Sequence, residues 1–225
     1  MSPQTPAAPL PIVVLISGEG SNLQAILDQA RRDRLIEVRA VIASRADAHG
    51  LERARLAGIA AQAVPVLEHP DREQYDAALS ECIDRYHPDL IVLAGFMRIL
   101  TGGFVNRYRG RLINIHPSLL PKYPGLNTHR RVLEAGDREH GCSVHFVTEA
   151  LDGGPVIAQA RVPVLPGDTD TRLRARVQSA EHRLYPQVLN WFAAHRVKLE
   201  NAQVFFDNAP LRQPRILAGN EDAIA

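Results

Sequence analysis

The sequence predicts an α/β fold built on a mostly parallel, doubly wound (Rossmann-like) sheet, and three observations lead to this prediction. Short apolar runs recur along the first two thirds of the chain, and segments with helical spacing separate several of them. The run at residues 90–94 is apolar throughout, as is typical of a central parallel strand buried on both faces. After residue 141 the pattern changes, and an antiparallel hairpin and one long helix are expected there.

The first βα unit begins with a buried strand at residues 12–16 and a glycine-rich loop at residues 18–22. A helix follows from Leu23 to about Arg32, because apolar residues recur there at spacings of three and four. The second unit has a strand at residues 38–43 and then a helix at residues 51–57, which Gly58 ends.

The third unit has a strand at residues 61–66 and a helix from Asp71, its expected N-cap, to about Tyr86. Strands at residues 90–94 and 112–115 complete the parallel part of the sheet. Ligands in such sheets bind beyond the carboxyl ends of the strands, so three segments become candidate sites. They are residues 18–22, 95–98 and 114–116.

The pattern of the second part of the chain predicts a hairpin and a helix. Residues 142–147 alternate with period two, a turn rich in glycine follows at residues 148–154, and a second strand covers residues 155–162. A helix at residues 171–195 is expected to bend or break near Pro186. We expect a disordered tail at residues 1–11, one domain at residues 12–200 and a surface extension at residues 201–225.

Composition limits the classes of function. The formal net charge is +1, which provides no overall attraction to nucleic acid or to an anionic membrane. No apolar stretch is long enough to span a membrane, and the N-terminus lacks the basic region of a signal peptide. Two cysteines are too few for a disulfide scaffold, so a reduced, cytoplasmic location is expected.

The loop at residues 18–22 joins a strand to a helix, so its backbone N–H groups and the Ser21 hydroxyl suit a phosphate. The alternative is a tight turn capped by Ser21 or Asn22. The loop lacks the lysine of a P-loop, and Leu23 replaces the third glycine of a dinucleotide motif. That replacement disfavours a further alternative, in which Ser44 and Arg45 bind the 2′-phosphate of NADP.

Asn114 and His116 lie two residues apart at the end of the fifth strand, so their side chains face the same side. A carboxamide can donate to a developing oxyanion, and an imidazole can transfer a proton near neutral pH. This pair suggests acyl-group chemistry, although an Asn-x-His segment before proline also serves as a simple strand cap. Pro121 and Pro124 keep the following loop from forming helix, which favours the functional interpretation.

Other residues have a functional and an ordinary interpretation. Asp152 precedes two glycines, as in many hairpin turns, but a carboxylate beside His116 would favour an imidazolium that can act as an acid. The apolar segment 96–100 forms either a ligand-binding wall or part of the core. Arg72 and Glu181 are ordinarily solvated charges. Metal-ligand spacing is absent, so no metal is proposed, and Cys82 and Cys142 are expected to be buried.

Taken together, these segments resemble the phosphoribosylglycinamide formyltransferases, which are folate-dependent. The resemblance spans about residues 12–200 and is specific in its Asn-x-His-Pro-Ser-x-Leu-Pro pattern with a later Asp-Gly-Gly. The segments that carry it are residues 13–26, 92–100, 113–125, 141–147 and 151–157.

The resemblance implies transfer of a formyl group from 10-formyltetrahydrofolate to the amine of glycinamide ribonucleotide. The catalytic residues would then be Asn114, His116 and Asp152, with His116 as general acid and base. The ribonucleotide would bind to Gly20, Ser21, Asn22 and Glu181, and Glu19 should point to solvent to avoid repelling its phosphate. The folate would contact Arg72, Met97, Arg98, Ile99, Leu100, Asn114, Thr148, Glu149, Ala150, Leu151 and Asp152.

Related activities remain as alternatives. A formyltetrahydrofolate hydrolase would share the three catalytic residues, although such enzymes resemble a longer chain with an N-terminal regulatory domain. A methionyl-tRNA formyltransferase would need a basic C-terminal domain, which neither the length nor the charge provides. A non-catalytic protein that binds folate or nucleotide is the third alternative. The expected partners are small-molecule substrates, with no nucleic acid or membrane, and the expected state is a monomer or homodimer.

Overall fold

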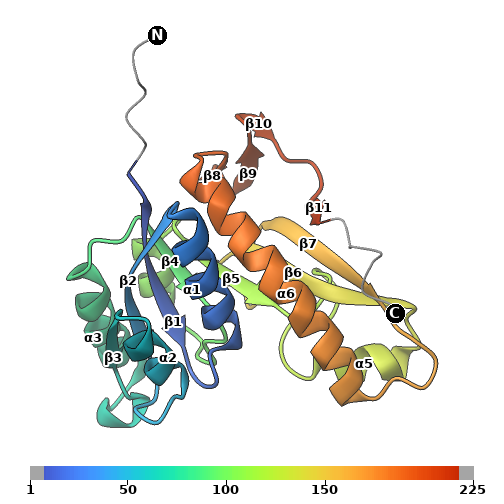
Figure 1. The fold of residues 1–225 in the computed structure, drawn as a ribbon, viewed down its shortest axis with the longest axis horizontal. Helices are drawn as coiled ribbons and strands as arrows, with labels where there is room; N and C mark the ends of the chain where they lie inside the picture. The colour runs from blue at the N-terminus through green and yellow to red at the C-terminus, as the bar shows by residue number, and fades with distance from the viewer. Residues whose placement is uncertain (1–7, 218–225) are drawn as a thin grey trace.

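The computed structural model describes residues 8–217 (Figure 1). Its main sheet has eight strands in the order β11-β7-β6-β5-β4-β1-β2-β3. In chain order these strands are β1 Leu10–Ile16, β2 Ile36–Ala43, β3 Ala60–Ala63, β4 Leu90–Leu93, β5 Leu112–His116, β6 Glu139–Phe146, β7 Val156–Pro163 and β11 Arg215–Leu217.

The predicted fold class is confirmed. Strands β3, β2, β1, β4 and β5 pair with one another in parallel. Strand β6 is antiparallel to both β5 and β7, which forms the expected hairpin at the other side of the sheet. Because β1, β4 and β5 are parallel neighbours, their carboxyl ends meet at one edge, where the candidate loops lie.

Helices cover both faces of the sheet. Helices α1 Ser21–Asp33 and α6 Asp170–Ala193 pack against each other in front of the sheet in Figure 1. With α2 Gly50–Leu56 they bury one apolar cluster, which includes Leu23, Leu51 and Leu184. The other face buries a second cluster under α3 Arg72–Asp84 and α4 Gly102–Arg107. Helix α5 Thr128–Ala135 follows the proline-rich loop.

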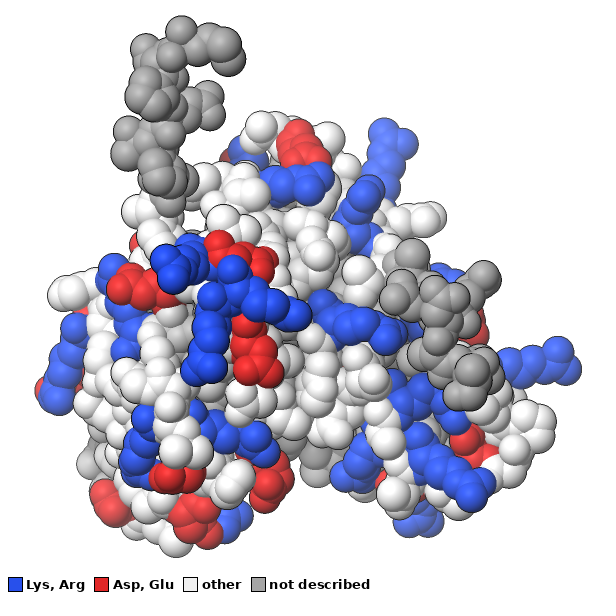
Figure 2. Space-filling model, in the orientation of Figure 1, with Lys and Arg blue, Asp and Glu red and all other residues white. Residues whose placement is uncertain are grey.

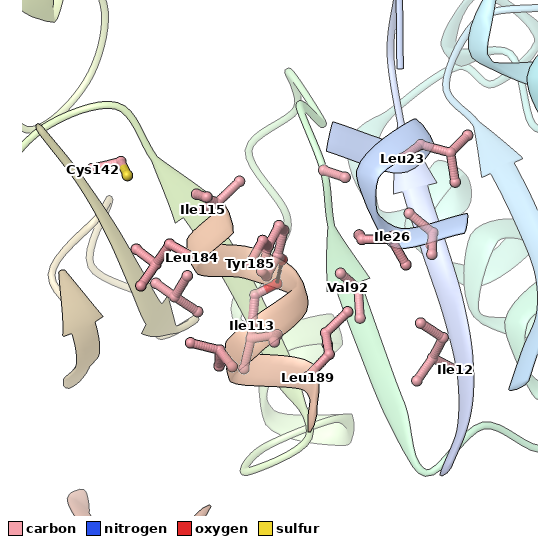
Figure 3. Packing of buried hydrophobic residues seen from close by; sticks show 14 of the residues in the cluster. Ile12, Leu23, Ile26, Val92, Ile113, Ile115, Cys142, Leu184, Tyr185 and Leu189 are labelled. Atoms are coloured by element: carbon pink, nitrogen blue, oxygen red, sulfur yellow. Dashed lines mark hydrogen bonds between the residues drawn. The ribbon is translucent and has the colours of Figure 1, made fainter. Parts of the chain in front are cut away.

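One buried tyrosine of helix α6 adds polar contacts to the apolar packing of the helix on the sheet. Figure 3 shows Tyr185 among the apolar side chains between α6 and strands β4 and β5. Its hydroxyl lies 2.9 Å from the carbonyl oxygen of Leu93 and 3.3 Å from that of Ile113, and can donate to either. The helix runs continuously through Pro186, so of the bend or break expected there, the break does not occur.

The ends of several elements differ from the predictions. Strand β1 begins at Leu10, two residues before the predicted start. Helix α1 begins at Ser21, and its N-cap is Gly20, which makes no side-chain capping bond, so neither Ser21 nor Asn22 caps it. The predicted cap of α3 is confirmed, because the Asp71 side chain accepts from the backbone N–H of Gln74.

The C-terminal region contains strands that the sequence did not predict. Strands β8 Val197–Glu200, β9 Gln203–Phe206 and β10 Ala209–Pro210 form a separate antiparallel sheet. Strand β11 then joins the edge of the main sheet beside β7. Residues 1–7, which belong to the expected N-terminal tail, and residues 218–225 lie outside the described part of the chain.

The surface agrees with the near-zero net charge. On the face in Figure 2, basic side chains are numerous but lie beside acidic ones in several places. Within residues 8–217, no helix has both the length and the apolar character needed to cross a membrane.

Candidate active site

Hydrogen bonds tie together the loops at the carboxyl edge of the sheet. The Ser17 hydroxyl, just after β1, lies 2.7 Å from the Ser44 hydroxyl that follows β2. It also accepts from the backbone N–H of Met97 after β4, at 2.8 Å. The ends of three parallel strands are thus held in one arrangement beneath the site.

An open cleft of about 1140 Å³ lies above this edge. It is lined by the predicted residues Gly20, Ser21, Asn22, Met97, Arg98 and Glu181. Ser44 and Arg45, which the sequence suggested only for another ligand, also line it, and several further lining residues lie outside the three predicted segments. Among these are Asp47, Leu67, His129, Arg174 and Gln178.

The glycine loop is shaped by a close backbone contact. Gly20 has a φ of 72°, and a Cβ at this position would lie 2.8 Å from the Cα of Gly50. Because other residues would be strained and crowded there, only glycine lets the loop pack against the start of α2. The first turn of α1 therefore opens into the cleft, as suits an anionic group. The Glu19 side chain is 85% exposed, as expected.

Glu181 of α6 lies against this helix start. Its Oε2 accepts from Asn22 Nδ2 at 2.9 Å, and the carboxylate is buried. Burial raises the pKa of Glu181, while the Asn22 hydrogen bond acts in the opposite direction. Among residues 8–217, the buried Oδ1 of Asn22 has no hydrogen-bond partner. Such an orphaned acceptor at a cleft suits a ligand that supplies a donor.

His116 and Asp152 are brought together from β5 and from the turn after β6. Asp152 Oδ2 lies 3.4 Å from His116 Nδ1, and both side chains are about nine-tenths buried. The other ring nitrogen, Nε2, lies 2.9 Å from the carbonyl oxygen of Tyr123. Each ring nitrogen therefore faces an acceptor, and this environment suits a protonated imidazole that donates from both nitrogens.

The Asp-Gly-Gly sequence is needed to present Asp152. Asp152 itself has a φ of 50°, and its Oδ2 accepts from the backbone N–H of Gly125 at 2.8 Å. A Cβ on Gly154 would lie only 1.8 Å from the carbonyl oxygen of Phe146. The glycine thus permits a close approach of the turn to β6, which ordinary side chains would prevent.

His145, which was not predicted as a site residue, joins this cluster. It lies opposite Asn114 in the β5–β6 pairing, and its Nε2 is 3.2 Å from Asn114 Nδ2. Its Nδ1 lies 2.9 Å from the Phe146 carbonyl oxygen, which assigns the proton to Nδ1. Burial lowers the pKa of His145, so a neutral ring can accept from Asn114 and orient its amide. The period-two pattern of β6 was the sequence signal that could have placed His145 on a strand beside β5.

The predicted folate residues come mainly from two segments, 97–100 and 148–152, and of these residues Met97 and Arg98 line the cleft. Met97, Ile99 and Leu151 are 68%, 63% and 59% exposed, which is unusual for large apolar side chains. Leu100 and Phe96 are instead buried in the second cluster, so core packing is the correct interpretation for those two side chains. Arg72 donates to the carbonyl oxygens of Ile99 and Leu100, at 3.0 and 3.2 Å.

The remaining predicted residues belong to the turn. Thr148 and Ala150 are joined within it by a 3.4 Å hydrogen bond, and Glu149 reaches out to α4. In the described part of the chain, no group of three or more potential ligands is placed to hold a metal ion. Both cysteines are buried and free.

Comparison with known proteins agrees with these features. Residues 10–189 match the formyl transferase family. The chain is 58% identical to the phosphoribosylglycinamide formyltransferase of Escherichia coli, over 89% of this chain and 95% of that protein. It is 44% identical to that of Haemophilus influenzae, with the same coverage. The enzyme structure from Coxiella burnetii superposes with a TM-score of 0.90 at 55% identity, over 93% of this chain and all of that one. The chain therefore belongs to the formyl transferase family, among its phosphoribosylglycinamide formyltransferases.

Proposed function

We propose that the enzyme transfers the formyl group of 10-formyltetrahydrofolate to the amine of 5-phosphoribosylglycinamide in de novo purine biosynthesis. The observation that carries the proposal is the position of the Asn114–His116–Asp152 cluster. It lies beside a cleft that begins at a helix N-terminus, and Ile115 and Pro117, which flank His116, line that cleft. Two ligands bound on either side of the cluster would meet at it.

The phosphoribosyl end fits the helix start. Backbone N–H groups of Gly20, Ser21 and Asn22 would hold the phosphate, with the helix dipole adding to the attraction. Glu181 would accept from the sugar or from the glycinamide chain. The orphaned Asn22 Oδ1 supports a ligand donor at this point.

The folate fits the opposite side. Its flat ring system would pack against the apolar side chains of Met97, Ile99 and Leu151. Arg72 and Arg98 provide positive charge near the acidic tail of the folate. The backbone of residues 148–152 would pair with the ring edges.

In the mechanism, the neutral amine attacks the formyl carbon and a new C–N bond forms. The carbonyl oxygen becomes an oxyanion, which the Asn114 amide stabilises together with the Nε2–H of protonated His116, after this N–H has left the Tyr123 carbonyl oxygen. The bond from the formyl carbon to the folate nitrogen then breaks, and His116 delivers its proton to that nitrogen. The proton lost by the amine restores the imidazolium, so no covalent enzyme intermediate is needed. Asp152 holds the charged ring from 3.4 Å.

One set of assays separates this function from its alternatives. Release of tetrahydrofolate that depends on the ribonucleotide is expected for transfer. Release without it would indicate a hydrolase, and binding of both ligands without turnover would indicate a sensor. His116→Ala is expected to lower kcat by at least about 100-fold, because a general acid is lost. A rate near that of the wild type would overturn the role of His116.

We also propose that residues 12–200 act as one catalytic domain, with residues 201–225 as an extension. In this proposal the enzyme works in the cytoplasm as a monomer or homodimer, without a metal ion and without nucleic acid or membrane as a partner. Sedimentation of the purified protein, followed by assay after treatment with a chelator, tests the assembly state and the metal independence.

A further inference from the structure

We propose that Asn106, which lies outside the cleft on α4, is a positioning residue for folate binding. It would act through Glu149 on the folate turn, which we define as residues 147–155. The inference rests on the proposed function in one respect, because it requires folate to be the formyl donor.

The first observation is a direct hydrogen bond. Asn106 Nδ2 donates to Glu149 Oε1 at 2.8 Å, across 43 residues of sequence. Glu149 is three residues from Asp152, whose carboxylate lies against His116. The bond therefore connects the turn that carries a catalytic carboxylate to helix α4, which precedes β5 in the chain.

The second observation concerns Gly102, the first residue of α4. A Cβ at this position would lie 3.1 Å from both Cδ and Oε1 of Glu149. The carboxylate therefore packs directly on the backbone at the start of α4, and the absence of a side chain leaves room for it. Asn106 and Gly102 hold the same carboxylate from two positions on one helix.

The start of α4 is itself well fixed. The Thr101 side chain caps the helix by accepting from the Phe104 N–H, at 3.2 Å. The Thr101 N–H donates to Asp76 Oδ2 of α3, at 2.6 Å. Arg72 fixes the two residues before Thr101 through their carbonyl oxygens. Glu149 thus joins the folate turn to a helix start that is held by several hydrogen bonds.

The side-chain contacts of the turn show why this link matters. Asp152 is held separately by the Gly125 N–H, whereas Thr148 bonds only within the turn. Without the link to α4, the Glu149 side chain would lose its hydrogen bond outside the turn. We expect folate binding to weaken more than the chemical step, because Asp152 keeps its own hydrogen bond. Ribonucleotide binding should not change, since α4 does not line the cleft.

Three variants test the link. Asn106→Ala is expected to raise the KM for 10-formyltetrahydrofolate by about 2- to 10-fold, because one hydrogen bond to a charged group is lost at an exposed site. Asn106→Asp should raise it further, because two carboxylates would then face each other. In the double variant Asn106→Asp with Glu149→Gln, the amide of Gln can donate to Asp, so the KM should return toward that of the wild type.

The control is Arg109→Ala, an exposed residue just after α4, which should leave both KM values unchanged. Equal folate KM values for wild type and Asn106→Asp, or a double variant no better than Asn106→Asp, would overturn the inference. Loss of ribonucleotide affinity in parallel would also overturn it, because that indicates general damage. If the wild-type enzyme itself does not use the folate donor, the proposed function fails instead, and the two failures are therefore distinguishable.

Discussion

At the scale of single residues, the negative charge of Asp152 can be distinguished from its role as a hydrogen-bond acceptor. Asp152 has two tasks, since one oxygen accepts from Gly125 N–H and also lies near the His116 ring. An asparagine at this position can still accept through its carbonyl oxygen but carries no charge. An asparagine would therefore remove the negative charge and keep the hydrogen bond that holds the turn.

Asp152→Asn is expected to lower kcat by at least about 10-fold, because the protonated form of His116 loses its counter-charge. The urea midpoint should change little, since the hydrogen bond from Gly125 is retained. Steady-state kinetics with both substrates and a urea titration provide the two measurements. A kcat equal to that of the wild type would show that the carboxylate has no electrostatic role.

Glu181 gives a residue-scale prediction for the other substrate. Glu181→Gln should raise the KM for the ribonucleotide by about 10-fold or more, because a charged acceptor in a buried site is replaced by a neutral one. The KM for the folate should stay the same, because Glu181 lies at the helix start and not at the turn. An increase confined to the folate KM would contradict the assignment of the two sides.

At the scale of elements, the position of α6 determines whether the cleft has a second wall. This helix provides Glu181, Gln178 and Arg174 to the cleft, and its Tyr185 hydroxyl can donate to either of two backbone carbonyls of the sheet. Gln178 also donates to the Ser21 hydroxyl at 2.8 Å, which joins α6 to the start of α1. The helix is therefore both part of the core and part of the site.

Tyr185→Phe should reduce the free energy of unfolding by about 1–2 kcal/mol, because one buried hydrogen-bond donor to the strand carbonyls is lost while the ring packing is kept. Urea denaturation of wild type and variant measures the difference. A variant as stable as the wild type would mean that the hydroxyl makes no net contribution. Comparison of the ribonucleotide KM would then show whether α6 has moved.

At the scale of the whole molecule, the sequence predicted what depends on local pattern. The parallel strands were predictable because strands buried on both faces read as apolar runs, and α3 because Asp71 is a standard cap. Helices α4 and α5 were missed because they are short and carry few apolar residues. The pairing of β11 with β7 joins residues far apart in sequence, so no local pattern contained it.

The same distinction applies to the site. Asn114 and His116 share one strand, so their common orientation followed from a period of two. His145 was missed because a histidine on a buried strand looks like an ordinary core residue until the register places it opposite Asn114. Arg174 and Gln178 come from a helix more than a hundred residues beyond the glycine loop. Their presence in the cleft follows from tertiary packing, which the sequence pattern does not report.

The stability of the whole chain should depend on pH through its buried histidines. His129 Nδ1 and His140 Nε2 lie 3.0 Å apart in the interior, and burial lowers the pKa of both, that of His140 to about 4. Burial also lowers the pKa of His145 and of His182. In the unfolded chain these groups titrate near the ordinary value of about 6.5. Below that pH the unfolded state binds more protons than the folded state, so stability falls as the pH drops from about 6.5 toward about 4.

We therefore expect the free energy of unfolding to decrease between pH 7.5 and about pH 5, with His140 contributing on the order of 1–2 kcal/mol. In His140→Asn this decrease should be smaller, because one buried group no longer takes up a proton on unfolding. His195→Asn is the matched control, since His195 is exposed, and its profile should follow that of the wild type. Urea titrations of the three proteins across this pH range measure the slopes. Parallel curves for wild type and His140→Asn would show that the buried pair does not determine the acid limit of the fold.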